Sequence, residues 1–229
     1  MTLYETIFTR RSVRQYDKAP LDSTALSTVR EVLDNAKQLP GQSARFDILT
    51  ANFLKRCPAP QAILAFADNG AISSLNIGYT LQGVDLYLQS IGLGSVWLGS
   101  AKPAANPKDY RIILAFGKTE APIRAGEREF KRKAVSEISN EDNAIANAAR
   151  LAPSAVNFQP WKLHFTSDKV TVQSNSRGIG KLLMANFQKI DLGIVLKHIE
   201  LAIEHEGKSV TAITPKEDSK TFSVEVSYA

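Results

Sequence analysis

A compact group of basic and hydroxyl side chains near the beginning of the sequence has the composition of an anion site. The stretch RRSVRQY contains Arg10, Arg11, Ser12 and Arg14. A guanidinium group is planar and permanently charged, and it can bind two phosphate oxygens at once. Because the cluster is compact, we expect it to bind a phosphate monoester rather than a long phosphodiester chain.

A second candidate binding segment lies in the other half of the sequence. In ARLAPSAVNFQPW, an alanine-rich helix meets Pro153, which cannot continue it. Ser154, Asn157 and Gln159 follow, and core packing alone does not require them there. The alternatives are an Asx-turn for Asn157 and bonding to backbone groups for Gln159. Trp161 fits a strand pattern and is expected in the core.

The histidine and cysteine pattern predicts neither a metal site nor a nucleophile triad. Cys57 is the only cysteine, which excludes an internal disulfide and a cysteine-based metal cluster. His198 and His205 are two helical turns apart, too far for an ordinary shared metal site. His164 alternates with apolar residues and is expected to face outward from a strand.

Composition limits the class of protein. The 229 residues are 44% hydrophobic, which supports a substantial core, and no apolar run is long enough to span a bilayer. The start, MTLYETIFTRRSVRQY, lacks the apolar region of a signal peptide. With one cysteine, this favours a cytoplasmic protein. The net charge of +5 admits an anionic partner, but the basic groups lack the interleaved aromatics of a single-strand nucleic-acid surface.

The elements that position both segments occur twice. Two long helices are predicted, each with a glycine after its first apolar position, Gly78 and Gly193. Each ends at a glycine, Gly92 and Gly207, as a left-handed C-terminal position prefers. The apolar positions are Ile77, Leu81, Val84 and Leu88 in the first helix, and Leu192, Leu196, Ile199 and Ile203 in the second.

Shorter elements correspond as well. We expect an earlier helix in each half, capped by Asp22 in the first and by Ser139 and Asp142 in the second. Three pairs of strands follow from the apolar pattern. They are 46–52 and 161–166, 95–98 and 209–213, and 111–116 and 222–228.

The sequence therefore predicts an α+β fold with two tandem half-repeats, 1–125 and 126–229. We expect these halves to pack as one intramolecular pseudodimer, because a duplicated chain can retain the geometry of an isologous dimer. The alternative is a chance similarity between two amphipathic helices.

Comparison of the halves predicts one composite site. Aligning Phe8 with Phe130 places Ala134 and Ser136 opposite Ser12 and Arg14. The turn at Pro153 aligns with 39–46, where most of its features are gone. Each half therefore keeps one part of a site. We expect the basic strip (10–14) to face the turn (153–157), which leaves one intact site and one degenerate site.

RRSVRQY together with APSAVNFQPW resembles the nitroreductase family of FMN-dependent oxidoreductases. GLGSVWLGSAKP (92–103), ILAFGK (113–118) and EFKRKAVSEI (129–138) add to the likeness, which covers nearly the whole chain. The order of both halves is similar to the single-chain branch in which two nitroreductase-like halves are fused. The resemblance implies a nitroreductase-like fold.

The resemblance also implies which residues bind FMN. Arg10, Arg11 and Ser12 would hold the phosphate, and Arg14 would lie nearer the ribityl chain and the flavin N1/C2=O edge. Lys131 and Arg132 match a basic pair that returns to the phosphate. The ring would be covered on one face by Trp97, Leu98, Gly99 and Ser100, and lined from the opposite half by Pro153, Ser154, Ala155 and Asn157.

The implied activity is hydride transfer from NADH or NADPH to flavin N5, and then reduction of an acceptor such as a nitroaromatic or quinone. No catalytic residue is assigned. We expect a small-molecule acceptor as partner, no nucleic acid or membrane, and a monomeric pseudodimer or weak homo-oligomer. Two alternatives stay open. One is an FMN-binding protein with little turnover; the other is a basic nucleic-acid-binding protein, disfavoured because helix-turn-helix, RRM and zinc patterns are absent.

Overall fold

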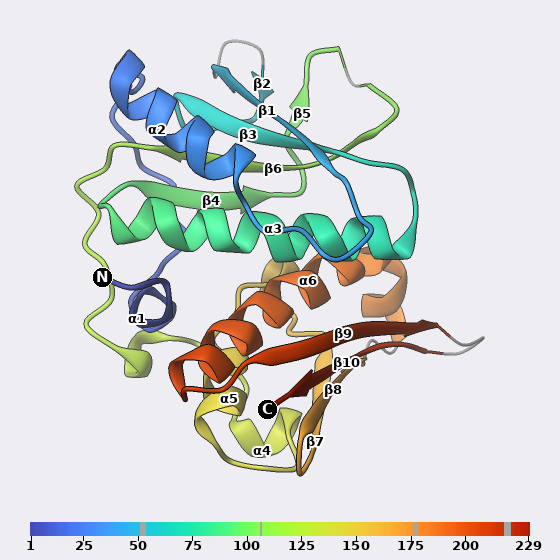
Figure 1. The fold of residues 1–229 in the computed structure, drawn as a ribbon. Helices are drawn as coiled ribbons and strands as arrows, with labels where there is room; N and C mark the ends of the chain where they lie inside the picture. Colours follow the sequence, from blue (N-terminus) through green and yellow to red (C-terminus); the bar gives the residue numbers. More distant parts are fainter. Residues whose placement is uncertain (51–53, 106, 176–177, 218–220) are drawn as a thin grey trace.

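Two four-stranded antiparallel sheets enclose a pair of long helices (Figure 1). The computed structural model describes residues 1–50, 54–105, 107–175, 178–217 and 221–229. Helices and antiparallel sheets are both present, so the α+β prediction is confirmed.

The first sheet is built from the first half of the sequence. Its strand order is β1-β3-β6-β4, and all neighbours are antiparallel. The strands are β1 (Arg45–Thr50), β3 (Gln61–Phe66), β6 (Tyr110–Gly117) and β4 (Gly94–Leu98). A separate short pair joins β2 (Leu54–Lys55) to β5 (Lys102–Pro103). The predicted end of β1, beyond residue 50, lies outside the described residues.

The second sheet has the order β7-β8-β10-β9 and is also antiparallel. Its strands are β7 (Trp161–Thr166), β8 (Lys169–Ser174), β10 (Phe222–Tyr228) and β9 (Val210–Glu217). The strands that the sequence paired across the halves take equivalent places: β1 with β7, β6 with β10, and β4 with β9. This is the arrangement that the duplication hypothesis predicts.

The sequence prediction lacks the short strands β2 and β5 and one strand of each four-stranded sheet, β3 and β8. All six residues of β3 are buried, so both of its faces are covered and the two-residue alternation of a half-exposed strand is missing. β8 is six residues long and its apolar residues alternate, with Val170 and Val172 buried, so a strand signal was present in the sequence.

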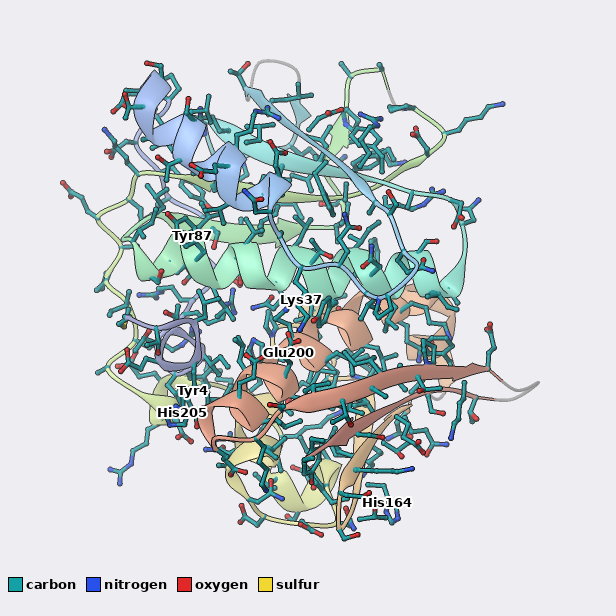
Figure 2. All side chains as sticks on the ribbon, in the orientation of Figure 1. Tyr4, Lys37, Tyr87, His164, Glu200 and His205 are labelled. Atoms are coloured by element: carbon teal, nitrogen blue, oxygen red, sulfur yellow. The ribbon has the colours of Figure 1, made fainter. Side chains whose placement is uncertain are left out.

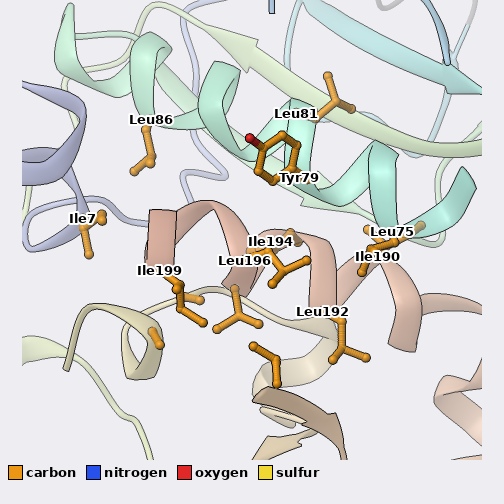
Figure 3. Packing of buried hydrophobic residues seen from close by; sticks show 14 of the residues in the cluster. Ile7, Leu75, Tyr79, Leu81, Leu86, Ile190, Leu192, Ile194, Leu196 and Ile199 are labelled. Carbon is orange, nitrogen blue, oxygen red and sulfur yellow. The ribbon is translucent and has the colours of Figure 1, made fainter. Parts of the chain in front are cut away.

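The long helices cross where the two predicted glycines meet. A Cβ atom on Gly78 of α3 (Ala71–Ser90) would lie 2.0 Å from the carbonyl oxygen of Ile190. A Cβ atom on Gly193 of α6 (Gly178–His205) would lie 2.0 Å from the carbonyl oxygen of Leu75. The two backbones therefore touch, which only glycine permits. Figure 3 shows the apolar side chains that fill the space around this crossing.

Both long helices end as predicted. Gly92 and Gly207 have φ angles of 85° and 77°, the left-handed conformation that favours glycine. The N–H of the next residue then donates back into each helix, Leu93 to the Leu88 carbonyl and Lys208 to the Ile203 carbonyl. This is the Schellman pattern, and it satisfies carbonyls at the helix ends.

One predicted helix cap is confirmed and the other is wrong. Asp22 caps α2 (Ser23–Asp34), its Oδ1 accepting from the Ala25 N–H at 2.9 Å. Asn143, rather than Ser139 or Asp142, caps α5 (Ala144–Arg150). Ser139 is extended and bridges to β7, so the chain is held away from helical geometry until Asn143.

Short helical segments and polar contacts complete the fold. α1 (Leu3–Ile7) is tied to the end of α6 by the ring of Tyr4, which stacks on His205 with centroids 3.8 Å apart. Glu200 of α6 pairs with Lys37, which follows α2, and both are labelled in Figure 2. The remaining segments are η2 (Glu127–Glu129), α4 (Val135–Ile138) and η3 (Ala155–Asn157). Among the described residues, no helix has the length and apolarity to cross a membrane.

Candidate functional site

A cleft of about 610 Å³ lies where segments from both halves of the sequence meet. Eleven of the predicted site residues line it, and they come from the basic strip, the end of β4 with its following loop, Arg132 and the turn 153–157. They are Ser12, Arg14, Trp97, Leu98, Gly99, Ser100, Arg132, Pro153, Ser154, Ala155 and Asn157. The structure thus brings the basic strip and the turn to one cavity.

The basic strip runs beside the first sheet. Ser12 forms a parallel bridge with Ser95 of β4, and the N–H of Val13 donates to the Ser95 carbonyl at 2.9 Å. This places Ser12 and Arg14 at the end of the cleft next to β4. Arg14 is exposed, so its guanidinium is accessible to a ligand.

Arg10 does not line the cleft. Its side chain is 1% exposed, and Nε donates to Oδ2 of Asp85 at 2.9 Å. Asp85 also accepts from Gln89 and from the Ser95 hydroxyl of β4, so the ion pair fastens the strip to the sheet and to α3. Nη2 of Arg10 is buried and has no hydrogen-bond partner among the described residues.

Arg11 and Lys131 also lie outside the cleft wall. Arg11 donates through Nη1 to the Pro122 carbonyl at 2.7 Å and lines a neighbouring groove, which Ser12 and Arg14 line as well. Lys131 is exposed, and its carbonyl accepts from the side-chain amide of Asn157. Arg11 therefore shares a groove with Ser12 and Arg14 but not the cleft, and Lys131 lines neither.

Arg132 is the charged centre of the cleft. It donates to Oδ1 of Asn157 and to the Leu151 carbonyl, whereas its Nε is buried without a described partner. Burial, followed by the nearby charges of Arg10, Arg124 and Arg150, lowers the pKa of Arg132 to about 10. No carboxylate in the described part of the chain forms an ion pair with it. An anion bound here would offset both the free-energy cost of burying the Arg132 charge and its repulsion by the neighbouring arginines.

The turn 153–157 is strained and held from several sides. Val156, Asn157 and Gln159 have φ angles of 46°, 60° and 50°, and for a β-branched residue such as Val156 this is unusual. The Ser154 hydroxyl accepts from the Gln159 N–H, and Asn157 contacts the Arg132 segment instead of closing an Asx-turn. Backbone strain that is fixed by its surroundings is frequent at functional sites.

The other expectations for this stretch are confirmed. Gln159 is buried and bonds to backbone groups, accepting from the Lys133 N–H and donating to the Asn157 carbonyl. Trp161 is fully buried in the core. His164 is exposed on β7, as its label in Figure 2 shows.

The wall opposite the turn is formed by the end of β4. The Trp97 indole N–H donates to Gln82 of α3, and the Gln82 amide in turn faces Nε2 of His198 at 3.1 Å. Burial lowers the pKa of His198 to about 3, so its ring is neutral. Gly99 packs directly on Phe187, since a Cβ there would lie 2.8 Å from the ring. This network fixes the wall to the helix pair.

Six further residues line the cleft that the sequence had not assigned to it. Five are apolar, and their pattern in the sequence indicates only that they belong to the core. Asp191 is different, because it is a carboxyl group at the beginning of an apolar helix face. The six are Ile112, Val156, Phe187, Ile190, Asp191 and Ile194.

Asp191 is a buried acid in the cleft wall. It is 3% exposed, and its Oδ1 accepts from the Ala155 N–H at 3.0 Å, which fastens the turn to α6. Its Oδ2 is buried and has no partner among the described residues. Burial raises the pKa of Asp191 to about 8, against the lowering effect of the Ala155 hydrogen bond. At neutral pH the carboxyl is therefore protonated.

This pKa predicts that the contribution of Asp191 to protein stability falls as the pH rises from about 4 to about 8, whereas the lowered pKa of His198 makes an opposing contribution below about 6.5. In that range the unfolded state releases the Asp191 proton while the folded state keeps it. Because asparagine does not titrate, the stability of Asp191→Asn relative to the wild type should increase by ~1.4 kcal/mol for each pH unit in this range. Urea denaturation of both proteins at pH 5, 6 and 7 measures the difference. A difference that is constant with pH contradicts the assignment.

Comparisons with known proteins agree with this fold and define its class. A structure from Thermotoga maritima MSB8, described as that of a nitroreductase, has 21% sequence identity and a TM-score of 0.74, covering 99% of this chain and 93% of that chain. The fold is therefore nitroreductase-like. A structure from Desulfovibrio desulfuricans, described as a nitroreductase in complex with FMN, has 21% identity and a TM-score of 0.48, covering 62% of this chain and 98% of that one.

The family follows from the sequence itself. A family model described as "Putative TM nitroreductase" matches residues 2–203, and the chain belongs to this nitroreductase family. The resemblance inferred from the motifs is thus confirmed. No curated protein matches the sequence.

Proposed function

We propose that the protein is an FMN-dependent oxidoreductase of the nitroreductase type, which uses NADH or NADPH. The observation that carries the proposal is the partly buried guanidinium of Arg132, which has no ion-pair partner among the described residues, in a cleft shared by the basic strip and the turn 153–157. Family membership supports oxidoreductase chemistry. The single cysteine and the apolar pattern support a cytoplasmic location.

The residues around Arg132 fit a phosphate group. Arg14 and Ser12 line the same cleft, and Arg124 and Arg10 increase the local positive potential. A dianionic phosphate bound beside the Arg132 guanidinium would offset the positive charge of the neighbouring arginines, which now helps to lower its pKa. The side chain already lies against Leu151 and Asn157, so little side-chain ordering is needed on binding.

The rest of the cleft fits a broad, flat ring with polar edges. Trp97, Ile190 and Ile194 supply apolar surface, and the small residues of the turn permit close approach. The backbone from Trp97 to Ser100 lies along one wall. When bound, FMN supplies the redox chemistry, taking hydride from NADH or NADPH and reducing a nitroaromatic or quinone. The residues that line the cleft would position the cofactor.

We propose one FMN per chain and activity as a monomer. A single chain contributes both the basic strip and the turn to the cleft. At the corresponding positions of the other half, Ala134 and Ser136 replace Ser12 and Arg14, which removes a hydroxyl and a guanidinium. The second equivalent place therefore lacks these phosphate ligands.

Titration of the purified protein with FMN tests the proposal. We expect saturation at about one FMN per chain, seen as quenching of flavin fluorescence, because only one composite cleft carries the ligand set. The holoprotein should then oxidise NADH or NADPH when a quinone is added. The absorbance of the reduced dinucleotide measures this.

Each result has a defined meaning. Two FMN per chain would contradict the single composite site, and no binding would overturn the proposal. Tight binding without oxidation of either dinucleotide would favour the alternative of a flavin-binding protein with little turnover.

A further inference from the structure

A second cavity of about 580 Å³ opens next to the cleft. Gly99, Phe187 and Ile190 line both cavities, so the two adjoin at the Phe187 ring. The second cavity is bounded by the start of α3, the loop after β5, the beginning of β6 and α6. We call it the basic annex, after the side chains Lys102, Lys108, Arg111 and Lys189 that line it.

The positive charge of the basic annex is only partly compensated: the carboxylates of Asp68 and Glu217 act electrostatically on Arg111 and Lys189. No described residue that lines it is acidic, and none of its four cations forms an ion pair with a described carboxylate. The acidic neighbours are already engaged. Asp109 pairs with Arg45, and Asp68 accepts from the Gly70 N–H at the start of α3.

Arg111 is held in a fixed position within the annex. Its Nε donates to the Asp68 carbonyl at 2.9 Å, and its Nη1 donates to the carbonyls of Lys108 and Tyr110. These acceptors orient the guanidinium but carry no negative charge to balance it. Burial also lowers the pKa of Lys189, which indicates that part of this positive charge lies away from water.

The N-terminal end of α3 adds to the same field. Ala71 and Ser74 of its first turn line the annex. Because the helix has 20 residues, its N-terminus carries a partial positive charge that favours an anion nearby, and the Asp68 carboxylate on the Gly70 N–H offsets part of it. Four cations and a helix N-terminus therefore face one cavity, beside an aromatic ring that separates it from the cleft.

We propose that the basic annex binds the phosphate groups of the reduced nicotinamide dinucleotide while the dihydronicotinamide ring lies in the adjoining cleft. The proposal rests on the proposed function, and it specifies how the electron donor is recognised. Of the substrates in that reaction, nitroaromatics and quinones carry no phosphate, whereas the dinucleotide carries at least two. A site with several cations therefore suits the donor rather than the acceptor.

The test compares a charged donor with an uncharged one. Lys102→Gln/Lys108→Gln removes two exposed annex charges without disturbing the Arg111 contacts to backbone carbonyls. With a neutral quinone as acceptor, kcat/KM is measured for the dinucleotide and for 1-methyl-1,4-dihydronicotinamide, which has no phosphate. The ratio of interest is kcat/KM for the dinucleotide divided by kcat/KM for the uncharged donor. We expect this ratio to be roughly fivefold to twentyfold lower in the variant than in the wild type, because KM for the dinucleotide rises.

A matched control is available on the same molecule. Lys18→Gln/Lys118→Gln removes the same charge from exposed positions that line neither the cleft nor the annex, and should leave the ratio within twofold. Equal ratios for the annex variant and the control would overturn the proposal. So would a loss that affects both donors equally.

Inorganic pyrophosphate separates this proposal from the proposed function. It should compete with the dinucleotide in the wild type and bind more weakly to the annex variant, as calorimetry of the holoprotein would show. If the wild type oxidises neither donor, the proposed function and the donor assignment both fail. Pyrophosphate binding that is equal in both proteins would overturn the anion site itself.

Discussion

Replacing Gly78 with alanine should destabilise the protein by more than ~3 kcal/mol, a large part of the 5–15 kcal/mol that typically holds a domain folded. The new Cβ would lie 2.0 Å from the Ile190 carbonyl oxygen and 3.0 Å from the Ile194 nitrogen. These are backbone atoms, which cannot rotate away. α3 and α6 would have to separate, which would open the core around their crossing.

The same argument applies to Gly193, and Gly83 provides a control. A Cβ on Gly193 would lie 2.7 Å from the Tyr79 nitrogen as well as 2.0 Å from the Leu75 carbonyl oxygen. At Gly83, on the same helix as Gly78, a Cβ meets only the end of the Lys197 side chain at 3.7 Å. Gly83→Ala should therefore gain up to ~1 kcal/mol from helix propensity.

Urea denaturation followed by circular dichroism measures these effects. We expect Gly78→Ala and Gly193→Ala to unfold at much lower urea, or to be recovered only as aggregates, and Gly83→Ala to unfold at slightly higher urea than the wild type. A Gly78→Ala protein as stable as the wild type would show that the helices do not touch at this point.

The spacing of residues in the sequence located these two glycines, but not the reason they are needed. Apolar positions at matched intervals placed Gly78 and Gly193 at equivalent points of two helices. That their backbones meet depends on how the helices cross, and a repeating pattern along one helix carries no information on that. The ends of the helices, in contrast, could be predicted from the residue type alone, and Gly92 and Gly207 adopt the predicted left-handed conformation.

The candidate site shows the same limit. The arginines of the basic strip were recognised by their type, but only the fold distinguishes Arg10, which pairs with Asp85, from Arg14, which lines the cleft. Asp85 is 75 residues away in the sequence. The raised pKa of Asp191 likewise arises from its burial in the folded protein. Such properties depend on long-range packing, which one sequence does not reveal.

Arg132→Met should weaken FMN binding about a hundredfold to a thousandfold while leaving the ligand-free protein at least as stable. Removing one partner of a buried charge pair costs about 3–5 kcal/mol, and each ~1.4 kcal/mol is a factor of ten in affinity. In the free protein, burial and the charges of Arg10, Arg124 and Arg150 already disfavour the Arg132 cation. Methionine keeps an unbranched side chain and removes that repulsion, which offsets the lost bonds to Asn157 and Leu151.

The opposite signs of these two effects identify Arg132 as a ligand-binding charge rather than a structural one. FMN fluorescence titration gives the affinity, and urea denaturation with and without FMN gives both stabilities. FMN should raise the denaturation midpoint of the wild type and have little effect on the variant. Arg128→Met is the control, because Arg128 is exposed, lies four residues earlier and does not line the cleft. If Arg132→Met destabilises the free protein but binds FMN with unchanged affinity, its guanidinium supports the turn 153–157 and the phosphate lies elsewhere.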